Sequence, residues 1–193
     1  MASEAAVKVP KRERTQARLL DAALELTREK GFEGATLQEI AARAGVTTGA
    51  IYGNFGSREG LFTALAERQW TAVRPKVRAG ASFAETMDAL AEAVIEALAE
   101  RRPGAANALK FRAYALEHEP VRARFRDRMA EGYAAGTAWM ASAFRPEELP
   151  MPPPVLARVI NAMIEGLIVQ GFMTPELTGD EEIRAAFRVL ART

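Results

Sequence analysis

The amino-acid sequence predicts an all-α fold, in which a small N-terminal domain of three helices is joined to a larger helical domain. Apolar residues recur at intervals of three and four, the spacing of one helix face. Capping residues precede these segments, and glycine or proline follows them. No segment alternates apolar and polar residues as a half-buried strand does. The 193 residues, 49% hydrophobic and 26% charged, can form a sizeable core without disulfides.

The first third of the chain is predicted to form a short arm and four helices. Gly31 follows apolar residues at helical spacing and is expected to end that helix. The segment from Thr36 to Glu39 is a capping box, in which each side chain accepts a hydrogen bond from the other residue's amide. Thr47 and Ser57 are expected to cap the next two helices. The predicted elements are a frayed arm at 1–10 and helices at 11–30, 37–44, 47–54 and 57–74.

The rest of the chain is predicted to add five helices. Ser82 and Glu85 form a second capping box. Pro120 suits a first helical position, and Asp180 is expected to cap the last helix. Five of the ten prolines fall within residues 145–154, which predicts a loop. The predicted helices are 82–101, 105–118, 120–144, 155–172 and 180–190. We expect one domain over residues 1–56 and a second over 57–193.

Composition excludes several classes of site. The absence of cysteine excludes disulfides and thiolate zinc sites, and a single histidine excludes a multi-histidine metal cluster within one chain. No phosphate loop, nucleophile elbow or metal-ligand spacing is present, so we expect no enzyme, cofactor or metal. There is no signal-peptide pattern, and Asn161, Glu165 and Gln170 interrupt the most apolar stretch, so we expect a cytoplasmic protein that does not span a membrane.

Basic residues are concentrated near the N-terminus, although the whole chain is nearly neutral. Lys and Arg total 26 against 25 Asp and Glu, so the net charge of +1 does not predict a general polyanion binder. Residues 1–20, however, hold five cations and two carboxylates, a net of +3. A helix-turn-helix pattern follows, with its turn at Gly45-Val46. A helix of two turns after this turn fits a major groove about 12 Å wide, and its outward residues are small, hydroxyl-bearing or amide-bearing.

The same segment resembles a known family. Residues 31–62 are GFEGATLQEIAARAGVTTGAIYGNFGSREGLF. This stretch, within a match over about residues 11–62, is similar to the DNA-binding domain of the tetracycline-repressor (TetR) family. The resemblance implies a homodimer that binds a palindromic operator in double-stranded DNA and is released when a small molecule enters the second domain.

The resemblance also assigns roles to residues. It implies phosphate contacts for Thr36, Thr47, Tyr52 and Arg58, where Arg58 stands in place of the family's usual lysine. Asn54 replaces the commoner histidine, and as an amide it can reach a phosphate or a base edge. The small residues at 49, 50 and 53 offer few bidentate base contacts, so we expect specificity to depend partly on DNA shape. The predicted DNA-binding residues are Thr36, Thr47, Thr48, Gly49, Ala50, Tyr52, Asn54 and Arg58.

Bulky residues in the middle helices are candidates for an effector pocket. Aromatic walls with a few polar tips suit an apolar or aromatic small molecule, although the same stripe is also what an ordinary core requires. The predicted pocket residues are Phe111, Tyr114, His118, Met129, Tyr133, Trp139, Met163 and Leu167.

The last two helices are candidates for a dimer interface. Their apolar stripes are wider than one core face requires, and two such helices from each protomer would make a four-helix bundle. Burial within one chain is the alternative. A further alternative for function is a DNA-binding regulator without an effector, controlled by a partner protein. The predicted interface residues are Val159, Ile160, Ile164, Ile168, Ile183, Phe187 and Leu190.

Overall fold

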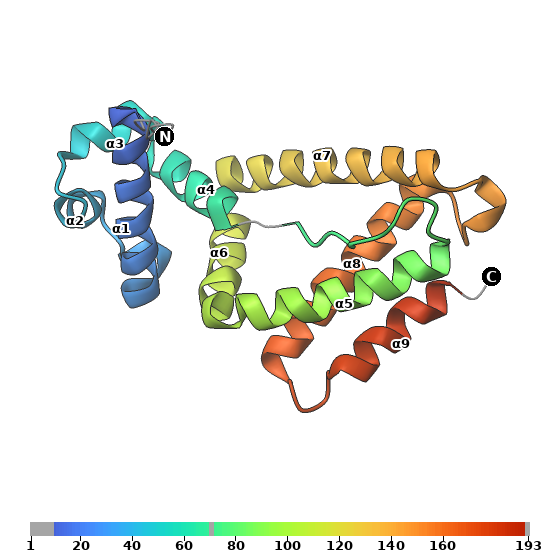
Figure 1. The fold of residues 1–193 in the computed structure, drawn as a ribbon. Helices are drawn as coiled ribbons and strands as arrows, with labels where there is room; N and C mark the ends of the chain where they lie inside the picture. Colours follow the sequence, from blue (N-terminus) through green and yellow to red (C-terminus); the bar gives the residue numbers. More distant parts are fainter. Residues whose placement is uncertain (1–9, 70–71, 192–193) are drawn as a thin grey trace, which may run out of the picture. The chain divides into compact units, whose positions relative to one another are not determined.

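A computed structural model describes residues 10–69 and 72–191, and in them the all-α prediction is confirmed (Figure 1). Those residues form nine α-helices and two short 3₁₀ turns, with no strand. The N-terminal helices are α1 (Lys11–Gly34), α2 (Leu37–Arg43), α3 (Thr48–Phe55) and α4 (Arg58–Gln69). After them come α5 (Phe83–Arg101), η1 (Arg102–Gly104), α6 (Ala105–Glu117), α7 (Glu119–Ala143), η2 (Pro146–Glu148), α8 (Pro153–Met173) and α9 (Asp180–Leu190).

The helices pack into two compact units. The first unit takes α1 to α4, nearly all of α6 and the beginning of α7 up to Phe125. The second unit takes residues 72–105 and everything after Phe125. This division in packing does not coincide with the predicted domain boundary after residue 56, because α4 and α6 pack with the N-terminal helices. Most of the predicted arm, residues 1–9, lies outside the described residues.

Glycine and capping residues set the ends of the first two helices. Gly31 interrupts the helical path with φ 75°, as predicted, although one more turn to Gly34 follows it. The Thr36–Glu39 capping box is confirmed, since the Glu39 amide donates to Thr36 Oγ1 at 3.2 Å and the Thr36 amide donates to Glu39 Oε2 at 3.3 Å. The Lys30 ammonium, followed by the Thr36 hydroxyl and amide, lowers the pKa of Glu39 to about 2.

Two predicted caps and one predicted helix end differ from the structure. Thr47 occupies the cap position of α3, but its side chain makes no capping hydrogen bond. The cap of α9 is Gly179 rather than Asp180, and the Gly179 amide donates to Glu182 Oε2 at 3.0 Å. The helix that begins after Ser57 is described as far as Gln69, and residues 72–74 are not helical, so the predicted end at 74 is too late. Pro75 accounts for part of this difference, because a proline disfavours helical backbone in the residue before it.

The core of the first unit joins α1 to the short helices and to α6. Leu19 and Leu26 of α1 are fully buried, together with Ile40, Ile51 and Phe62 from α2, α3 and α4. α6 contributes Tyr114, whose ring lies against the rings of Phe32 and Phe62 with centroids 5.4 and 5.6 Å away. The short helices α2 and α3 therefore depend on long-range packing, because isolated helices of seven or eight residues are not stable in water.

The second unit is built around α5, which contacts α8 and α9 (Figure 1). Ile183 and Phe187 of α9 are fully buried against it, and Leu156 of α8 lies in the same core. The helices approach closely where α8 carries Gly171, since a Cβ there would lie 2.7 Å from Leu98 Cδ2 of α5. The apolar face of α5 is thus satisfied within one chain.

The segment Pro146–Met173 needs a correction. The sequence expectation was that polar residues prevent this stretch from crossing a membrane, but by length and composition alone it is long and apolar enough. Such a segment is also typical of a core helix, and α8 packs into the second unit's core through Leu156, Ile164 and Ile168. Only 28% of its most apolar window is buried, which leaves an apolar face of α8 uncovered.

Candidate nucleic-acid interface

The turn between α2 and α3 is fixed by a glycine and an arginine. Gly45 has φ 63°, a conformation that residues with a side chain rarely adopt. The Arg18 guanidinium of α1 donates to the carbonyl oxygens of Ala44 and Gly45, the latter at 3.3 Å. A Cβ on Gly45 would lie 2.6 Å from Arg18 Nη2. The absence of a side chain at Gly45 therefore makes room for this guanidinium.

α3 presents the predicted reading residues outward. Ile51 is its buried anchor, while the Tyr52 side chain is 54% exposed. The Asn54 amide nitrogen donates to the Ala50 carbonyl at 2.7 Å, and its Oδ1 is buried without a partner. Asn54 therefore faces its own helix in this conformation. Of the other predicted contacts on or before α3, Thr47 and Gly49 are exposed, and Thr48 and Ala50 are half-buried.

Thr36 and Arg58 have roles within the fold. Thr36 is exposed at the start of α2, where its hydroxyl already contacts Glu39 Oε2 at 2.9 Å. The Arg58 guanidinium donates to the carbonyl oxygens of Phe32, Glu33 and Ala35, at 2.9 Å for Ala35, and lies 4.8 Å from the centroid of the Phe62 ring. Arg58 therefore holds the end of α1 against α4, and its phosphate contact stays a prediction.

The three glycines around the end of α3 differ in their surroundings. A Cβ on Gly53 would meet no atom within 4 Å, so this glycine leaves open space on the exposed side of α3. Gly56 has φ 78° at the end of α3, and a Cβ on Gly60 would lie 2.0 Å from the Phe55 carbonyl oxygen. Gly56 and Gly60 thus permit a tight connection from α3 to α4.

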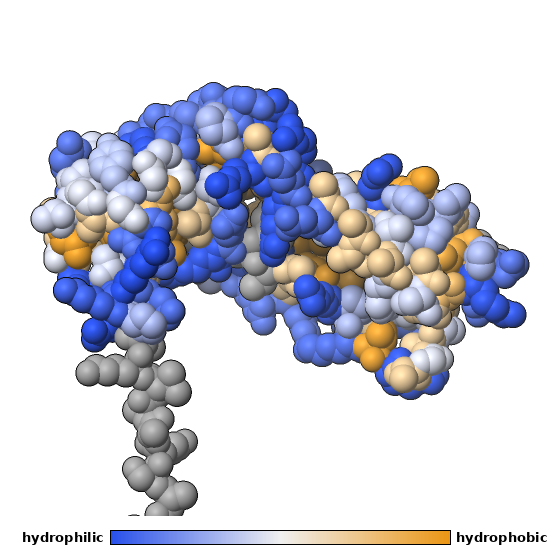
Figure 2. Space-filling view, turned by 90° about the horizontal axis from the view of Figure 1, so that it is seen from above, coloured by the Kyte–Doolittle hydropathy of each residue, from blue (hydrophilic) through white to orange (hydrophobic). Residues whose placement is uncertain are grey.

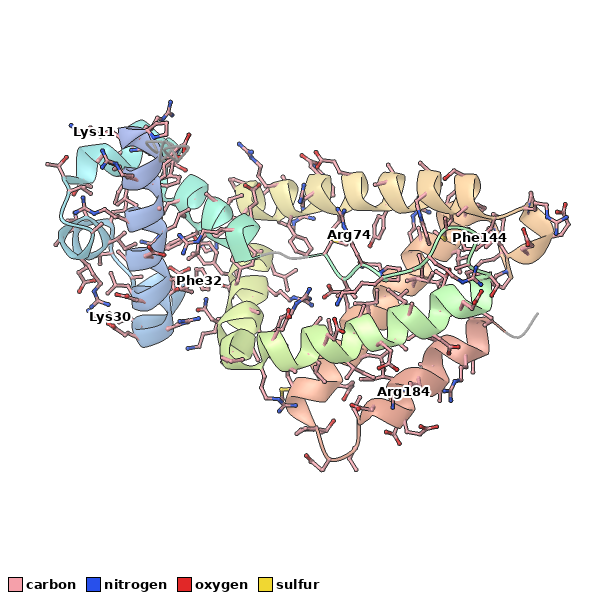
Figure 3. The ribbon with its side chains drawn as sticks, viewed as in Figure 1. Lys11, Lys30, Phe32, Arg74, Phe144 and Arg184 are labelled. Atoms are coloured by element: carbon pink, nitrogen blue, oxygen red, sulfur yellow. The ribbon has the colours of Figure 1, made fainter. Side chains whose placement is uncertain are left out.

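Unpaired cations lie at the start of α1. Lys11, Arg12 and Arg14 are exposed and have no ion pair within residues 10–69 and 72–191. Lys11 and Arg14 are seven and four residues before Arg18, so they share its helix face, which points toward the α2–α3 turn. Figure 1 places the beginning of α1 next to α3, and Figure 3 labels Lys11 at that end of α1.

Three cations farther from α3 are paired. Lys30 pairs with Glu39, Arg43 pairs with Glu29 at 2.6 Å, and Arg68 pairs with Asp21. These exposed pairs contribute little to stability, but they neutralise charge along the lower part of α1, where Figure 3 labels Lys30. Lys11 and Arg14 thus place unpaired positive charge at the end of α1 that lies near α3. Sequence reasoning noted the basic start of the chain but did not place Lys11 and Arg14 among the site residues.

The predicted effector residues fall into two groups. The Phe111, Tyr114 and His118 side chains belong to the first unit, in which the Phe111 and Tyr114 rings contact the Phe32 ring. In the second unit the half-buried Tyr133 hydroxyl accepts a hydrogen bond from Asn161 at 3.4 Å, and Trp139, 41% exposed, packs edge-on against Phe144. The remaining predicted residues, all half-buried, are Met129, Met163 and Leu167.

The predicted dimer interface is mostly internal. Ile164, Ile168, Ile183 and Phe187 are buried in the second unit's own core, so they cannot meet another subunit. The alternative of burial within one chain holds for these four residues, because α5 covers the stripe that they form. Val159 is half-buried, and Ile160 and Leu190 are half-buried against the same core.

A second, outward face of α8 includes only Val159 of the predicted interface residues. Val155 and Met173 are 46% and 65% exposed, Ala162 and Gly166 are exposed, and Val159 and Val169 are half-buried. These residues follow one another at intervals of four, three, four, three and four, the spacing of a helix-packing seam. We call them the α8 seam. Figure 2 shows one face of the molecule, on which apolar residues lie among hydrophilic ones.

Comparison with known proteins relates the N-terminal helices to bacterial DNA-binding regulators. Residues 19–65 match the family model for bacterial regulatory proteins of the tetR family. A 58-residue segment is 50% identical to the HTH-type transcriptional regulator SrpR of Pseudomonas putida, covering 30% of this chain and 27% of SrpR. Alignments with curated relatives of this kind span only about a third of this chain and less than half of the relatives' length.

Solved structures resemble nearly the whole chain. GusR of Salmonella enterica superposes with a TM-score of 0.76 at 21% identity, covering 96% of this chain and all of that one. NalD of Pseudomonas aeruginosa, described as a secondary repressor of a multidrug efflux pump, superposes with a TM-score of 0.63 at 25% identity, covering 93% of this chain and 98% of that one. The fold of both units is therefore one that solved bacterial regulators share.

Proposed function

We propose that this chain, a DNA-binding transcriptional regulator of the TetR family, represses transcription as a homodimer on a palindromic operator. We further propose that a small molecule releases it from the DNA. One observation carries this proposal above the others: the outward face of α3 and the unpaired cations at the start of α1 lie on one side of the first unit. This arrangement supplies groove contacts and phosphate contacts together. The function requires no catalysis and would be carried out in the cytoplasm.

On DNA, α3 would enter the major groove. The exposed Tyr52 ring and the open side of Gly53 allow the helix to approach the backbone and base edges closely. Lys11 and Arg14 would contact the phosphates beside the groove. Two copies of the first unit, about 34–36 Å apart, would reach successive grooves on one side of the duplex.

The α8 seam supports the homodimer. Its small central residues, Ala162 and Gly166, allow two helices to pack closely, and a Cβ on Gly166 would meet no atom of its own chain within 4 Å. Two exposed residues of α9, Ala185 and Val189, extend the apolar surface. We propose this outward surface, in place of the buried residues predicted from the sequence, as the contact in a four-helix bundle.

An apolar or aromatic effector is the ligand class that we propose. Half-buried Met129, Met163 and Leu167 with the Tyr133–Asn161 pair offer apolar contacts and a polar anchor in the second unit. Binding would favour a dimer in which the two α3 helices are wrongly spaced, with a coupling of about 1–3 kcal/mol per ligand. Control by a partner protein without an effector is the alternative, and a binding assay with apolar ligands separates the two.

Salt dependence tests the proposed DNA face. Lys11→Gln and Arg14→Gln should each weaken binding to any duplex and lower the salt slope by about one, because each removes one phosphate contact. Fluorescence anisotropy with a random-sequence duplex between low and physiological salt measures this slope. Arg28→Gln, which removes an exposed cation without a described ion pair farther along α1, is the matched control.

Arg58→Gln should behave differently. It should lower the stability of the first unit without changing the salt slope, because the guanidinium is bound to backbone carbonyls. A lowered slope in Arg58→Gln, with unchanged slopes in Lys11→Gln and Arg14→Gln, would contradict the assignment of the DNA face.

A further inference from the structure

Three metal-ligating side chains meet in the first unit at a place that DNA binding does not use. Glu33 lies in the last turn of α1, Glu117 ends α6, and His118 follows it. One ligand atom from each of the three lies within 4.8 Å of the other two. Glu33 and Glu117 are exposed, whereas His118 is half-buried.

The orientation of His118 points to a cation. Its Nδ1 lies 2.8 Å from the Tyr114 carbonyl oxygen, and its ring stacks on the Tyr114 ring with centroids 3.9 Å apart. A carbonyl only accepts hydrogen bonds, so Nδ1 is the donor to it, and in the tautomer with its proton on Nδ1 the Nε2 atom presents a lone pair to a metal ion. Nε2 lies 3.5 Å from Glu33 Oε1, which is also an acceptor. Histidines that bind metals are held in this way, with the other ring nitrogen donating to a carbonyl.

We propose that Glu33, Glu117 and His118 bind a divalent transition metal ion of the Zn²⁺ type. One imidazole nitrogen and two carboxylate oxygens suit zinc, whereas Mg²⁺ and Ca²⁺ prefer oxygen ligands alone. The two carboxylates balance the charge of the ion, and three protein ligands leave a fourth position for water. The exposed glutamate side chains can turn to bring their oxygens to about 2 Å from the ion.

The ion would join two segments that are distant in sequence. Glu33 follows the break at Gly31, and its carbonyl oxygen accepts from Arg58 at 3.3 Å. Glu117 and His118 continue from α6, whose Tyr114 lies in the core of the first unit. Metal binding would therefore fasten the end of α1 to the end of α6 and stabilise the first unit.

Zinc titration of the full chain tests the site. After removal of metals with a chelator, isothermal titration with ZnCl₂ should show one bound equivalent per chain. The thermal midpoint of unfolding should rise by several degrees and return when chelator is added. Binding to Glu33→Gln, Glu117→Gln and His118→Gln should each be at least tenfold weaker. Glu176→Gln, which changes an exposed carboxylate elsewhere, should bind like the parent chain.

Two outcomes would overturn the proposal. One is no saturable binding by the parent chain, which would leave His118 and Glu33 as an ordinary proton-dependent ion pair. The other is equal binding by the parent, Glu117→Gln and His118→Gln, which would indicate zinc held elsewhere. Glu117→Gln alters only an exposed side chain and should fold normally, and the visible absorption of bound Co²⁺ reports the same site without reference to DNA.

Discussion

Replacing Gly60 with alanine should destabilise the first unit by at least about 3 kcal/mol, near the upper end of single substitutions. A Cβ at this position would lie 2.0 Å from the carbonyl oxygen of Phe55 and 3.2 Å from its carbon. These are backbone atoms, so no side-chain rotation relieves the clash. The end of α3 would have to move away from the beginning of α4, and both helices are anchored in the core, by Ile51 and by Leu61 with Phe62.

Urea unfolding followed by circular dichroism measures this loss. Gly53→Ala is the matched control, because it makes the same change on α3 where a Cβ would meet no atom within 4 Å. It should raise stability by up to about 1 kcal/mol, the difference in helix propensity between alanine and glycine. Equal stability of Gly60→Ala and the parent chain would show that the α3–α4 connection is not as close as described.

Ala162→Arg should separate the dimer and weaken operator binding at least a hundredfold. In a symmetric interface the substitution places two like charges at the middle of the α8 seam, where each would be buried without a partner. The seam has no room for them if Ala162 and Gly166 are the points of closest approach. A separated protomer binds one half-site and loses the effective concentration that the second one provides, which is commonly worth 10²–10⁴ in affinity.

Sedimentation equilibrium and anisotropy on an operator duplex measure the two effects. Ala99→Arg makes the same change at an exposed position of α5 and should remain dimeric with normal affinity. Both variants should keep the parent's helical content, because arginine is a good helix former. A dimeric Ala162→Arg with unchanged affinity would place the subunit contact on a different surface.

Local signals predicted the two capping boxes correctly. The capping boxes at Thr36 and Ser82 are present as predicted, because a few adjacent residues satisfy these amides without help from the rest of the chain. The ends of helices were harder to predict from the sequence. The pattern predicted that α4 continues to residue 74, but residues 72–74 are not helical. Gly31 was identified, but not the further turn behind it, whose carbonyls are bound by Arg58 from α4.

The same difference between local and long-range signals applies to the candidate site. The outward residues of α3 follow from helix periodicity, so Tyr52 was placed correctly on the exposed face. The partners of Arg58 lie 23 to 26 residues away in sequence, and nothing near Arg58 reveals them. Both faces of α8 are apolar, and only the packing of α5 and α9 decides that Ile164 is buried while Ala162 is exposed.

Selection from a random duplex library by the purified chain tests whether it binds a palindromic operator as a homodimer. We expect enrichment of an inverted repeat whose half-site centres are about 10–10.5 base pairs, or a multiple of that distance, apart. We also expect a dimer in the bound complex by sedimentation. A chain that stays monomeric and retains no duplex at low ionic strength, or that enriches no repeated half-site, would contradict this proposal.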